Sequence, residues 1–153
     1  MTAQTIMNPN PVVLHATDTV GKAARYLLDH HLRHLPVVDK QGCYLGTFGI
    51  YSLLRLTLPK AATVEQGLDN VAFLTGGLKE LGGHLRDVAG QSVVKGLRQD
   101  IEVVHPETPL METVLLLLRA RTALAVVDKE TGRLVGMISS WEALDKIAAE
   151  GGI

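Results

Sequence analysis

The sequence predicts an α+β fold made of two tandem units, each with the element order β-α-β-β-α. The main reason is a repeat: "VLHATDTV" at 13–20 returns as "VVHPETPL" at 103–110, and "LPVVDKQGCYLG" at 35–46 returns as "LAVVDKETGRLVG" at 124–136. Separated blocks that recur in one order indicate a duplicated structural unit. A second reason is size, because a unit of about 50 residues buries too little core alone. We therefore expect the two units to pack sheet against sheet.

The elements of the first repeat follow from local patterns. A short strand is expected at 12–14, and Thr17 or Asp18 offers a side-chain oxygen to cap the helix that apolar spacing predicts at 20–29. The β-branched run "LPVVD" then predicts a strand that ends at an Asp-Lys and glycine turn. A second strand at 44–50 and a closing helix at 52–56 complete the unit.

The second repeat has the same elements. A strand is expected at 103–104, and Thr108 is the expected cap of a helix at 110–119, with Pro109 suited to its first turn. The run "LAVVD" predicts the next strand. A strand at 134–139 and a helix at 141–149 follow. The offset between the repeats is 90 residues from His15 to His105 and 89 from Asp39 to Asp128.

Between the repeats, residues 57–92 are expected to form a helical insertion. Apolar residues at steps of three and four make one helical stripe, namely Val64, Leu68, Val71, Leu74, Leu78, Leu81, Leu85 and Val88. The pairs Gly76–Gly77 and Gly82–Gly83 are expected to mark turns or close packing, since an interior glycine costs about 1 kcal/mol relative to alanine. Two interpretations remain open, a helical hairpin that covers the edge of the protein and a dimer or partner surface. The expected domains are 1–56, 57–92 and 93–153.

Composition excludes several classes of protein. The chain has 15 basic and 16 acidic residues, so it predicts no surface for nucleic acid or for an anionic membrane. The single Cys43 fits a reducing compartment. The first residues lack a basic region followed by an apolar stretch, and the longest strongly apolar run, 114–118, is too short to cross a bilayer. We expect a cytoplasmic protein.

These patterns together resemble the cystathionine-β-synthase (CBS) domain. The resemblance lies in "LPVVD", the glycine hairpin, "GMIS" with its terminal helix, and the lead-in segments "TIMNPNPVVLHATDTV" and "VVKGLRQDIEVVHPETPL". It covers roughly residues 5–56 and 93–149. Two tandem copies are called a Bateman module. The resemblance implies a regulatory, non-catalytic protein that needs no cofactor, binds AMP, ADP, ATP or S-adenosylmethionine between the repeats, and pairs as a flat homodimer.

The resemblance places the main ligand element at the end of the last strand, where the family pattern is G-h-h-[ST]-x-x-D. Residues 136–142 read "GMISSWE", so Ser139 matches and Glu142 stands in place of the aspartate. A hydroxyl beside helix N-terminal amides suits a phosphate or ribose oxygen, and a carboxylate accepts hydrogen bonds from ribose hydroxyls. The same two residues have the spacing of a capping box. Both roles can hold in different states of the protein.

By the same resemblance, residues of both repeats line the cleft. The half-site of Ser139 and Glu142 is expected to include Met7, Pro11, Val12, Leu32, Arg33, His34 and Met137. A weaker half-site is expected at Arg121, Thr122, Ala123, Gly49 and Ser52. It is expected to be degenerate or empty, because glycine replaces the hydroxyl residue and serine replaces the acid. Arg33 and Arg121 are either phosphate contacts, since a guanidinium offers two parallel donors, or solvated arginines.

The stretch "HHLRHLPVVD" at 30–39 raises the question of a metal site. His30 and His34 are four apart and would share a helix face, as two metal ligands must. No carboxylate or cysteine completes a coordination set, so we interpret the stretch as a helix end, with His31 in a left-handed conformation. His15 and His105 occupy equivalent positions and are interpreted as structural.

Three functions remain open at this level. The preferred one is a regulatory protein that senses an adenosine ligand and passes the signal to an unknown protein. A structural dimerisation module that binds no ligand is the alternative, and a histidine-based metal sensor is less favoured. No nucleophile–base pair or carboxylate dyad in the sequence indicates catalysis.

Overall fold

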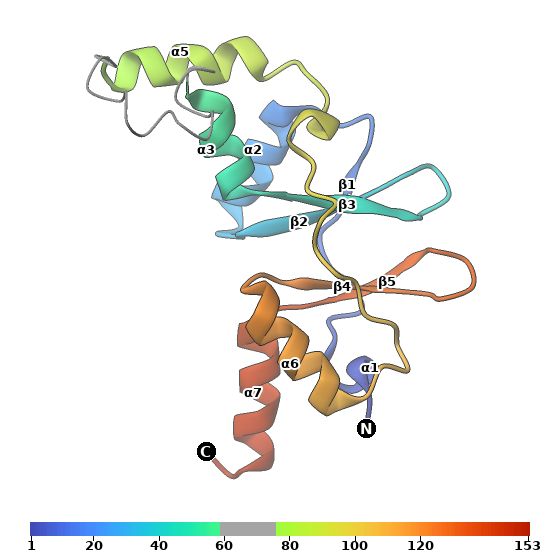
Figure 1. Ribbon diagram of the computed structural model, residues 1–153. Coiled ribbons are helices and arrows are strands. Elements are labelled where there is room, and N and C mark those ends of the chain that lie inside the picture. The colour runs from blue at the N-terminus through green and yellow to red at the C-terminus, as the bar shows by residue number, and fades with distance from the viewer. Residues whose placement is uncertain (59–75) are drawn as a thin grey trace. The chain divides into compact units, whose positions relative to one another are not determined.

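The computed structural model describes residues 1–58 and 76–153 and contains helices and two sheets (Figure 1). The first repeat contains β1 (Leu14–His15), α2 (Val20–Asp29), β2 (His34–Val38), β3 (Tyr44–Gly49) and α3 (Ile50–Thr57). The second contains α6 (Leu110–Ala120), β4 (Leu124–Val127), β5 (Leu134–Ile138) and α7 (Ser140–Glu150). The remaining elements are α1 (Ala3–Ile6), α5 (Leu78–Val88) and the 3₁₀ turn η2 (Val93–Gly96). The predicted α+β class is confirmed.

Each repeat contributes one sheet. In the first, β1 runs parallel to β2 with Leu14 opposite Val37, and β3 lies on the other side of β2. In the second, β4 and β5 are antiparallel, with Leu124 opposite Ile138. The strand expected at 103–104 is reduced to a single parallel bridge between Val104 and Val126.

The two hairpin turns have similar hydrogen bonds, and in each an Asp carboxylate accepts from the N–H two residues later and from one further N–H. The Asp39 carboxylate accepts from the backbone N–H groups of Gln41 and Cys43, both at 2.9 Å. The Asp128 carboxylate accepts from Thr131 and Glu130, also at 2.9 Å, and these bonds hold the pKa of Asp128 below its usual value. The recurrence explains why an Asp begins both turns.

The helix caps differ from the prediction. The residue before α2 is Thr19, whose Oγ1 accepts from the Lys22 backbone N–H at 3.2 Å, so neither Thr17 nor Asp18 is the cap. The residue before α6 is Pro109, 90 positions later, and it has no side-chain acceptor. Thr108 instead accepts from the His105 N–H at 2.9 Å. Both helices thus begin at the same repeat position, and only the first has a side-chain cap.

The ends of the same two helices also correspond. His31 follows α2 with φ 51°, which confirms the left-handed conformation predicted there. Arg121 follows α6 with φ 53°. His31 and Arg121 are 90 positions apart, so the repeat specifies the turn although neither residue is a glycine.

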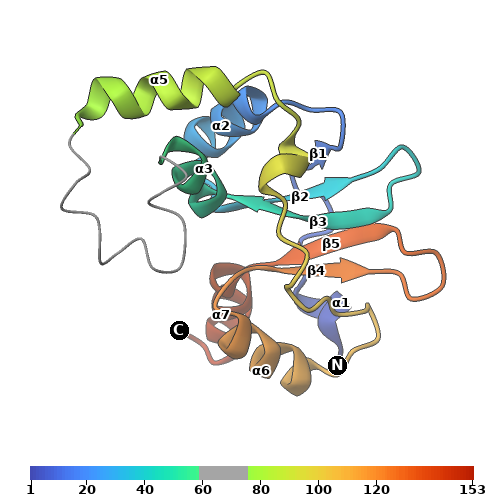
Figure 2. The same cartoon turned by 45° about the horizontal axis from the view of Figure 1, so that its top comes forward.

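The insertion contributes one described helix, α5, which lies alongside α2 and α3 (Figure 2). Gly76 and Gly77 precede it, and Gly77 is extended, so the turn predicted for this pair stays a prediction. Gly82 and Gly83 lie inside the helix, and a Cβ on either would meet no atom within 4 Å, so the turn or close packing predicted there is wrong. The predicted stripe positions Val64, Leu68, Val71 and Leu74 lie outside the described residues.

The compact units of the structure interleave the two repeats. The first unit contains Met1–Ala16, Pro36–Thr47 and Arg98–Ile153, and the second contains Thr17–Leu35 and Phe48–Leu97. Ala3 N–H donates to the Thr108 carbonyl at 2.8 Å, and Val93 N–H donates to the Asp18 carbonyl at 3.0 Å. These two bonds are 90 positions apart, so each repeat receives a lead-in segment from a distant part of the chain. The sequence boundaries at 56 and 93 stay a prediction.

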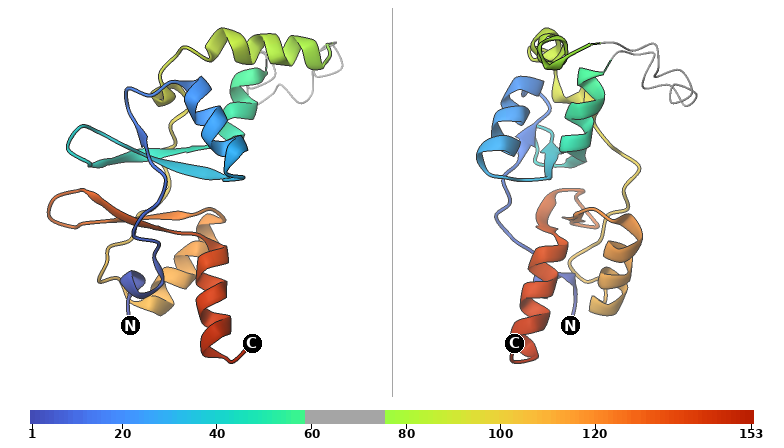
Figure 3. Two further views of the ribbon diagram at one scale, coloured as in Figure 1. Left: turned by 180° about the vertical axis from the view of Figure 1, so that it is seen from behind. Right: turned by 90° about the vertical axis from the view of Figure 1, so that its left-hand side faces the viewer.

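The core of the second repeat shows why this lead-in matters. Ala3 and Ile6 of α1 are buried in one cluster with Val104 and with residues of both helices and both strands, and the cluster consists of Ala3, Ile6, Val104, Leu117, Leu124, Val126, Ile138 and Ala143. Figure 3 shows α1 beside α6 and α7. None of the helices in 1–58 and 76–153 combines the length and apolarity that crossing a bilayer requires.

Candidate functional site

Ser139 and Glu142 form a reciprocal cap at the start of α7. The Ser139 backbone N–H donates to Glu142 Oε2 at 2.7 Å, and the Glu142 backbone N–H donates to Ser139 Oγ at 3.2 Å. This is the capping box that the spacing predicts. Glu142 holds only one of its oxygens in that bond, and a carboxylate has further acceptor capacity.

Met7 lies against β5, the strand that leads to these residues, in the first compact unit. Asn8 pairs with Met137 through two backbone hydrogen bonds of 2.8 and 3.0 Å. A Cβ at Gly136 would stand 2.8 Å from Met7 Sδ and from the Asn8 carbonyl, so only glycine permits this approach. The structure therefore brings the predicted residues Met7, Met137 and Ser139 to one end of β5.

Pro11 and Val12 lie in the same compact unit, in the segment that leads to β1. Both are partly or largely exposed, Val12 at 38%. Arg121, Thr122 and Ala123 also belong to this unit, where they connect α6 to β4. Ala123 packs on the cluster of Ala125, Val127 and Met137.

In the second compact unit, Arg33 and His34 lie against Gly49. The Arg33 carbonyl accepts from the Ile50 N–H at 3.0 Å. A Cβ at Gly49 would stand 2.9 Å from that carbonyl and 3.1 Å from His34 Nδ1. The imidazole thus occupies the space into which a side chain at 49 would project. Arg33 and His34, which were predicted for the main half-site, are therefore neighbours of Gly49, which was predicted for the weaker one.

Ser52 is also enclosed. Its Oγ accepts from the Gly49 N–H at 3.3 Å, and the residue is 7% exposed. A Cβ at Gly96 would stand 3.2 Å from Ser52 Cβ and 2.7 Å from the Phe48 ring, so η2 packs closely over this helix start. A ligand at Ser52 would compete with both contacts.

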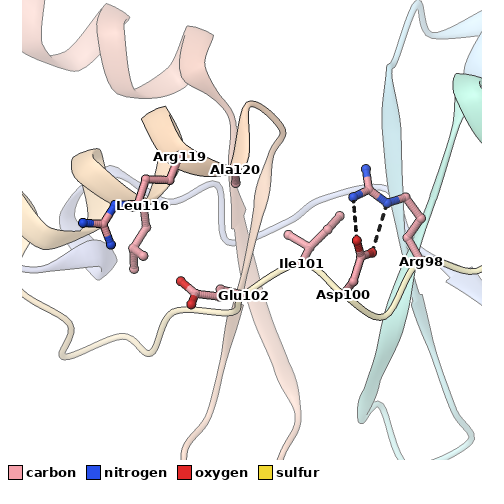
Figure 4. A pocket seen from close by; sticks show the side chains of 7 residues that line it. All are labelled: Arg98, Asp100, Ile101, Glu102, Leu116, Arg119 and Ala120. Atoms are coloured by element: carbon pink, nitrogen blue, oxygen red, sulfur yellow. Dashed lines mark hydrogen bonds and ion pairs between the residues drawn. The ribbon is translucent and has the colours of Figure 1, made fainter.

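A cavity of about 320 Å³ opens in the second repeat, a size typical of small-molecule sites. Its walls come from the segment that leads into the repeat and from the end of α6 (Figure 4), and consist of Arg98, Asp100, Ile101, Glu102, Leu116, Arg119 and Ala120. Arg98 donates to the Asp100 carboxylate through Nε at 3.2 Å and Nη2 at 3.1 Å. Two arginines and two carboxylates therefore give the walls both signs of charge.

Sequence reasoning missed this cavity, although a signal was present. Ile101 and Glu102 are 90 positions after Pro11 and Val12, which were predicted to line the cleft. Adding the repeat offset of 90 to Pro11 and Val12 gives Ile101 and Glu102, which form one wall of the cavity. Ala120 directly precedes Arg121, so the cavity borders the segment predicted for the weaker half-site.

The histidines make ordinary structural contacts. His105 Nδ1 lies 2.8 Å from the Val127 carbonyl, and the His30 ring meets the Tyr26 ring edge-on at 6.2 Å between centroids. Over residues 1–58 and 76–153, no group of three or more His, Cys, Asp or Glu side chains is placed to hold a metal ion.

Comparison with known proteins shows the family. The model of the CBS domain matches residues 3–58 and 92–149, which is most of the chain. The structure is similar to that of CBSX2 of Arabidopsis thaliana, whose complex with AMP matches with a TM-score of 0.72 at 24% identity and covers 97% of both chains. It is also similar to the CBS domain pair of protein MJ0100 in complex with 5′-methylthioadenosine and S-adenosyl-L-methionine, with a TM-score of 0.65 at 16% identity and 98% of both chains covered.

A curated relative matches a smaller part. L-aspartate semialdehyde sulfurtransferase of Methanocaldococcus jannaschii is 26% identical over 61 residues. The match covers 40% of this chain and 12% of that protein.

Proposed function

The chain belongs to the CBS domain family, and on this premise we propose that it is a non-catalytic regulatory protein that binds an adenosine-containing ligand. The ligand class is AMP, ADP, ATP or S-adenosylmethionine. Binding changes how the protein pairs or docks and so passes the signal to another protein. The protein acts as a cytoplasmic homodimer and needs no cofactor for its fold.

The arrangement at the end of β5 carries this proposal. Ser139 and Glu142 stand at a helix start, with Met137 two residues before Ser139 and Met7 against Gly136. The amides and hydroxyl suit a phosphate or ribose oxygen, and Glu142 suits the ribose hydroxyls. Similar structures have been solved with AMP and with S-adenosyl-L-methionine, which supports the ligand class. We assign Pro11 and Val12 to the same site, and Leu32, Arg33 and His34 stay predicted site residues.

A ligand bound at the start of α7 competes with a hydrogen bond that is already present there. The Glu142 carboxylate already accepts from the Ser139 N–H at 2.7 Å. A ribose that takes this oxygen releases the Ser139 N–H, which then needs a ligand oxygen as its new acceptor. A ligand that takes this oxygen replaces the cap at the start of α7, whereas one that bonds only to the second carboxylate oxygen leaves the cap in place. This exchange makes the α7 start the element that responds to binding.

The cavity at Arg119 is proposed as the second position. It borders Arg121–Ala123, and its mixed charges suit a ligand that has both an anionic group for Arg119 and hydroxyls for Glu102. The enclosed Gly49 and Ser52 are expected to add little binding energy.

A thermal-shift panel tests the function. We expect AMP, ATP or S-adenosylmethionine to raise the melting temperature, since ligand at a hundred times its Kd stabilises a protein by about 2.7 kcal/mol. Zn²⁺ and Ni²⁺ are expected to have no such effect. A response to none of these compounds would instead support the structural dimerisation module, and a response to metal alone would support the metal sensor.

A further inference from the structure

The cavity of the second repeat contains one pair of charges that is already bonded and two charges that are not. Arg98 donates to the Asp100 carboxylate through Nε and Nη2, so these two charges neutralise each other. Within residues 1–58 and 76–153, the side chains of Arg119 and Glu102 have no hydrogen-bonding or ionic partner. Figure 4 shows the bonded pair on one side of Ile101 and the two unbonded charges on the other.

The first repeat shows that the bonded pair belongs to a turn. At the positions of Arg98 and Asp100, 90 residues earlier, the chain has Asn8 and Asn10. The Asn8 side-chain oxygen accepts from the Asn10 N–H at 3.0 Å, so a hydrogen bond joins the same two positions in both repeats. Arg98 is therefore committed to the turn, and Arg119 is the guanidinium that remains for a ligand.

The two unbonded charges are particular to the second repeat. The counterpart of Glu102 is Val12, which has no charge, and the counterpart of Arg119 is Asp29. A phosphate monoester carries a charge of about −1.5 to −2, so it would be attracted by Arg119 and repelled by Glu102. The cavity therefore favours a ligand group that has one charge of each sign over a phosphate.

The rest of the cavity lining is apolar and well supported. Three lining side chains also pack on the core cluster of the second repeat, namely Ile101, Leu116 and Ala120. The segment that holds Glu102 is fixed to β3, because Arg98 and Thr47 exchange two backbone hydrogen bonds of 2.8 and 2.9 Å. A ligand at this position thus meets a short apolar surface together with one cation and one anion.

An α-amino-acid group matches this lining. Its carboxylate suits the two parallel donors of the Arg119 guanidinium. A ribose hydroxyl suits Glu102, but an ammonium suits it better because that hydrogen bond is charged on both sides. The helix α6 ends at Ala120, which lines the cavity, and the partial negative charge of a helix C-terminus also favours a cation. An unbranched apolar side chain of the amino acid can lie on Ile101 and Leu116.

We propose that the cavity binds the α-amino-acid group of its ligand, with the carboxylate at Arg119 and the ammonium at Glu102. The group is attached to adenosine, as in S-adenosylmethionine, or belongs to a free amino acid with an unbranched apolar side chain. The adenosine-linked case rests on the proposed function and specifies which of its ligands takes this second position. AMP, ADP and ATP bind instead at Ser139 and Glu142.

Calorimetry of the full chain with four compounds isolates the amino-acid group. S-adenosylhomocysteine and 5′-methylthioadenosine share adenosine and a thioether, and only the first carries an amino acid. Neither has the sulfonium charge of S-adenosylmethionine, so that charge does not confuse the comparison. S-adenosylhomocysteine is expected to bind about tenfold more tightly, since each of two exposed charged contacts contributes a few-fold. L-methionine tests the free amino acid, and AMP tests the phosphate.

Variants of the two charged residues test the two contacts. E102Q and R119Q are each expected to reduce the preference for S-adenosylhomocysteine over 5′-methylthioadenosine by roughly threefold and to leave the affinity for 5′-methylthioadenosine unchanged. E102K is expected to raise the affinity for AMP, because repulsion of the phosphate becomes attraction. These residues are exposed, so folding is expected to survive, and circular dichroism checks it.

Two further variants serve as controls. E107Q removes one exposed acid from the same segment outside the cavity, so it changes the net charge as E102Q does and is expected to keep the parent preference. E142A weakens the position at the start of α7. The preference for S-adenosylhomocysteine is expected to persist in E142A and to be lost in E142A/E102Q, which assigns it to the cavity.

Each result has a separate meaning. Equal affinity for S-adenosylhomocysteine and 5′-methylthioadenosine, or a preference that E102Q and R119Q leave unchanged, would refute the amino-acid group while the binding of either compound still supported the proposed function. L-methionine binding that E102Q weakens, with no response to any adenosine compound, would support the cavity assignment and refute the proposed function. Binding of none of the compounds would refute both, and an AMP affinity that E102K does not raise would refute the selection by charge.

Discussion

Single residues show how strictly the repeat is maintained in the structure. His31 and Arg121 have different side chains, yet both follow a helix and both have φ near 50°. A non-glycine residue in this conformation costs roughly 1–2 kcal/mol because its Cβ approaches the following carbonyl. The tight connection from helix to strand is thus retained at an energetic cost in both halves.

Replacing Arg121 by glycine is expected to stabilise the protein. The left-handed strain disappears, and the gain of roughly 0.5–1 kcal/mol remains after the greater freedom of glycine in the unfolded chain is counted. Chemical denaturation measures it. The matched control is Arg25→Gly inside α2, which is expected to lower the free energy of unfolding by about 1 kcal/mol. If both variants lose stability equally, the conformation at 121 is not strained.

Glu142 is the residue on which the proposed ligand site depends most. Removing one side of a charged hydrogen bond costs about 1.5–3 kcal/mol, so Glu142→Ala is expected to weaken an adenosine ligand by roughly ten- to a hundredfold. Glu142→Gln keeps an acceptor for the Ser139 N–H and removes only the charge, which separates loss of the cap from loss of the ribose contact.

Calorimetry on these variants and on Ser52→Ala decides the assignment. Ser52 is enclosed and bonded to Gly49, so its replacement is expected to leave ligand affinity nearly unchanged. Abolished binding in Ser52→Ala together with parent affinity in Glu142→Gln would place the ligand in the other half of the protein.

At the scale of elements, α5 is the helix least explained by its own sequence. It contains Gly82 and Gly83 in its interior and buries none of its residues fully. Its anchors are instead the Gly21 N–H at the Ala89 carbonyl and the His84 ring at the Thr57 carbonyl. The apolar stripe predicted the helix, but the glycines were given a role in turning or packing that the structure does not show.

Glycine-to-alanine changes in α5 and in α2 distinguish a glycine with no neighbour within 4 Å from a glycine in close contact with α5. Gly82→Ala and Gly83→Ala meet no atom within 4 Å, so each is expected to raise stability by up to about 1 kcal/mol. Gly21→Ala would place its Cβ 3.2 Å from the Ala89 carbonyl oxygen and is expected to weaken the contact with α5. Hydrogen exchange of the α5 amides measures both effects: exchange is expected to slow in Gly82→Ala and Gly83→Ala and to quicken in Gly21→Ala. Faster exchange in Gly82→Ala would contradict the prediction.

For the whole molecule, the repeat made most of the fold predictable. Apolar spacing and the turn residues located α2 exactly and the other elements of the repeats within one or two residues, apart from the 103–104 strand. Those signals are local, so they depend on residues that are close in sequence. The exchange of lead-in segments was not predicted, because Ala3 and Thr108 carry no local sign that their backbones meet.

The candidate site was predictable only in part, for a related reason. The capping box of Ser139 and Glu142 is a three-residue pattern and was found directly. The contact of His34 with Gly49, the enclosure of Ser52 by Gly96, and the cavity at Arg119 depend on segments that come together only in the folded chain. Only the repeat offset from Pro11 and Val12 pointed toward that cavity.

The exchanged lead-in also determines when the second repeat is completed during protein synthesis. The Ala3 N–H bonds to the Thr108 carbonyl, and Ile6 is buried among residues of α6, α7 and the β4–β5 hairpin. A ribosome that adds about 5–20 residues per second needs roughly 7–27 s to reach the last of these partners after it has made α1. Throughout that interval Ile6 lacks the partners that bury it in the folded protein. A piece of sequence made early is therefore buried only after most of the chain has been translated.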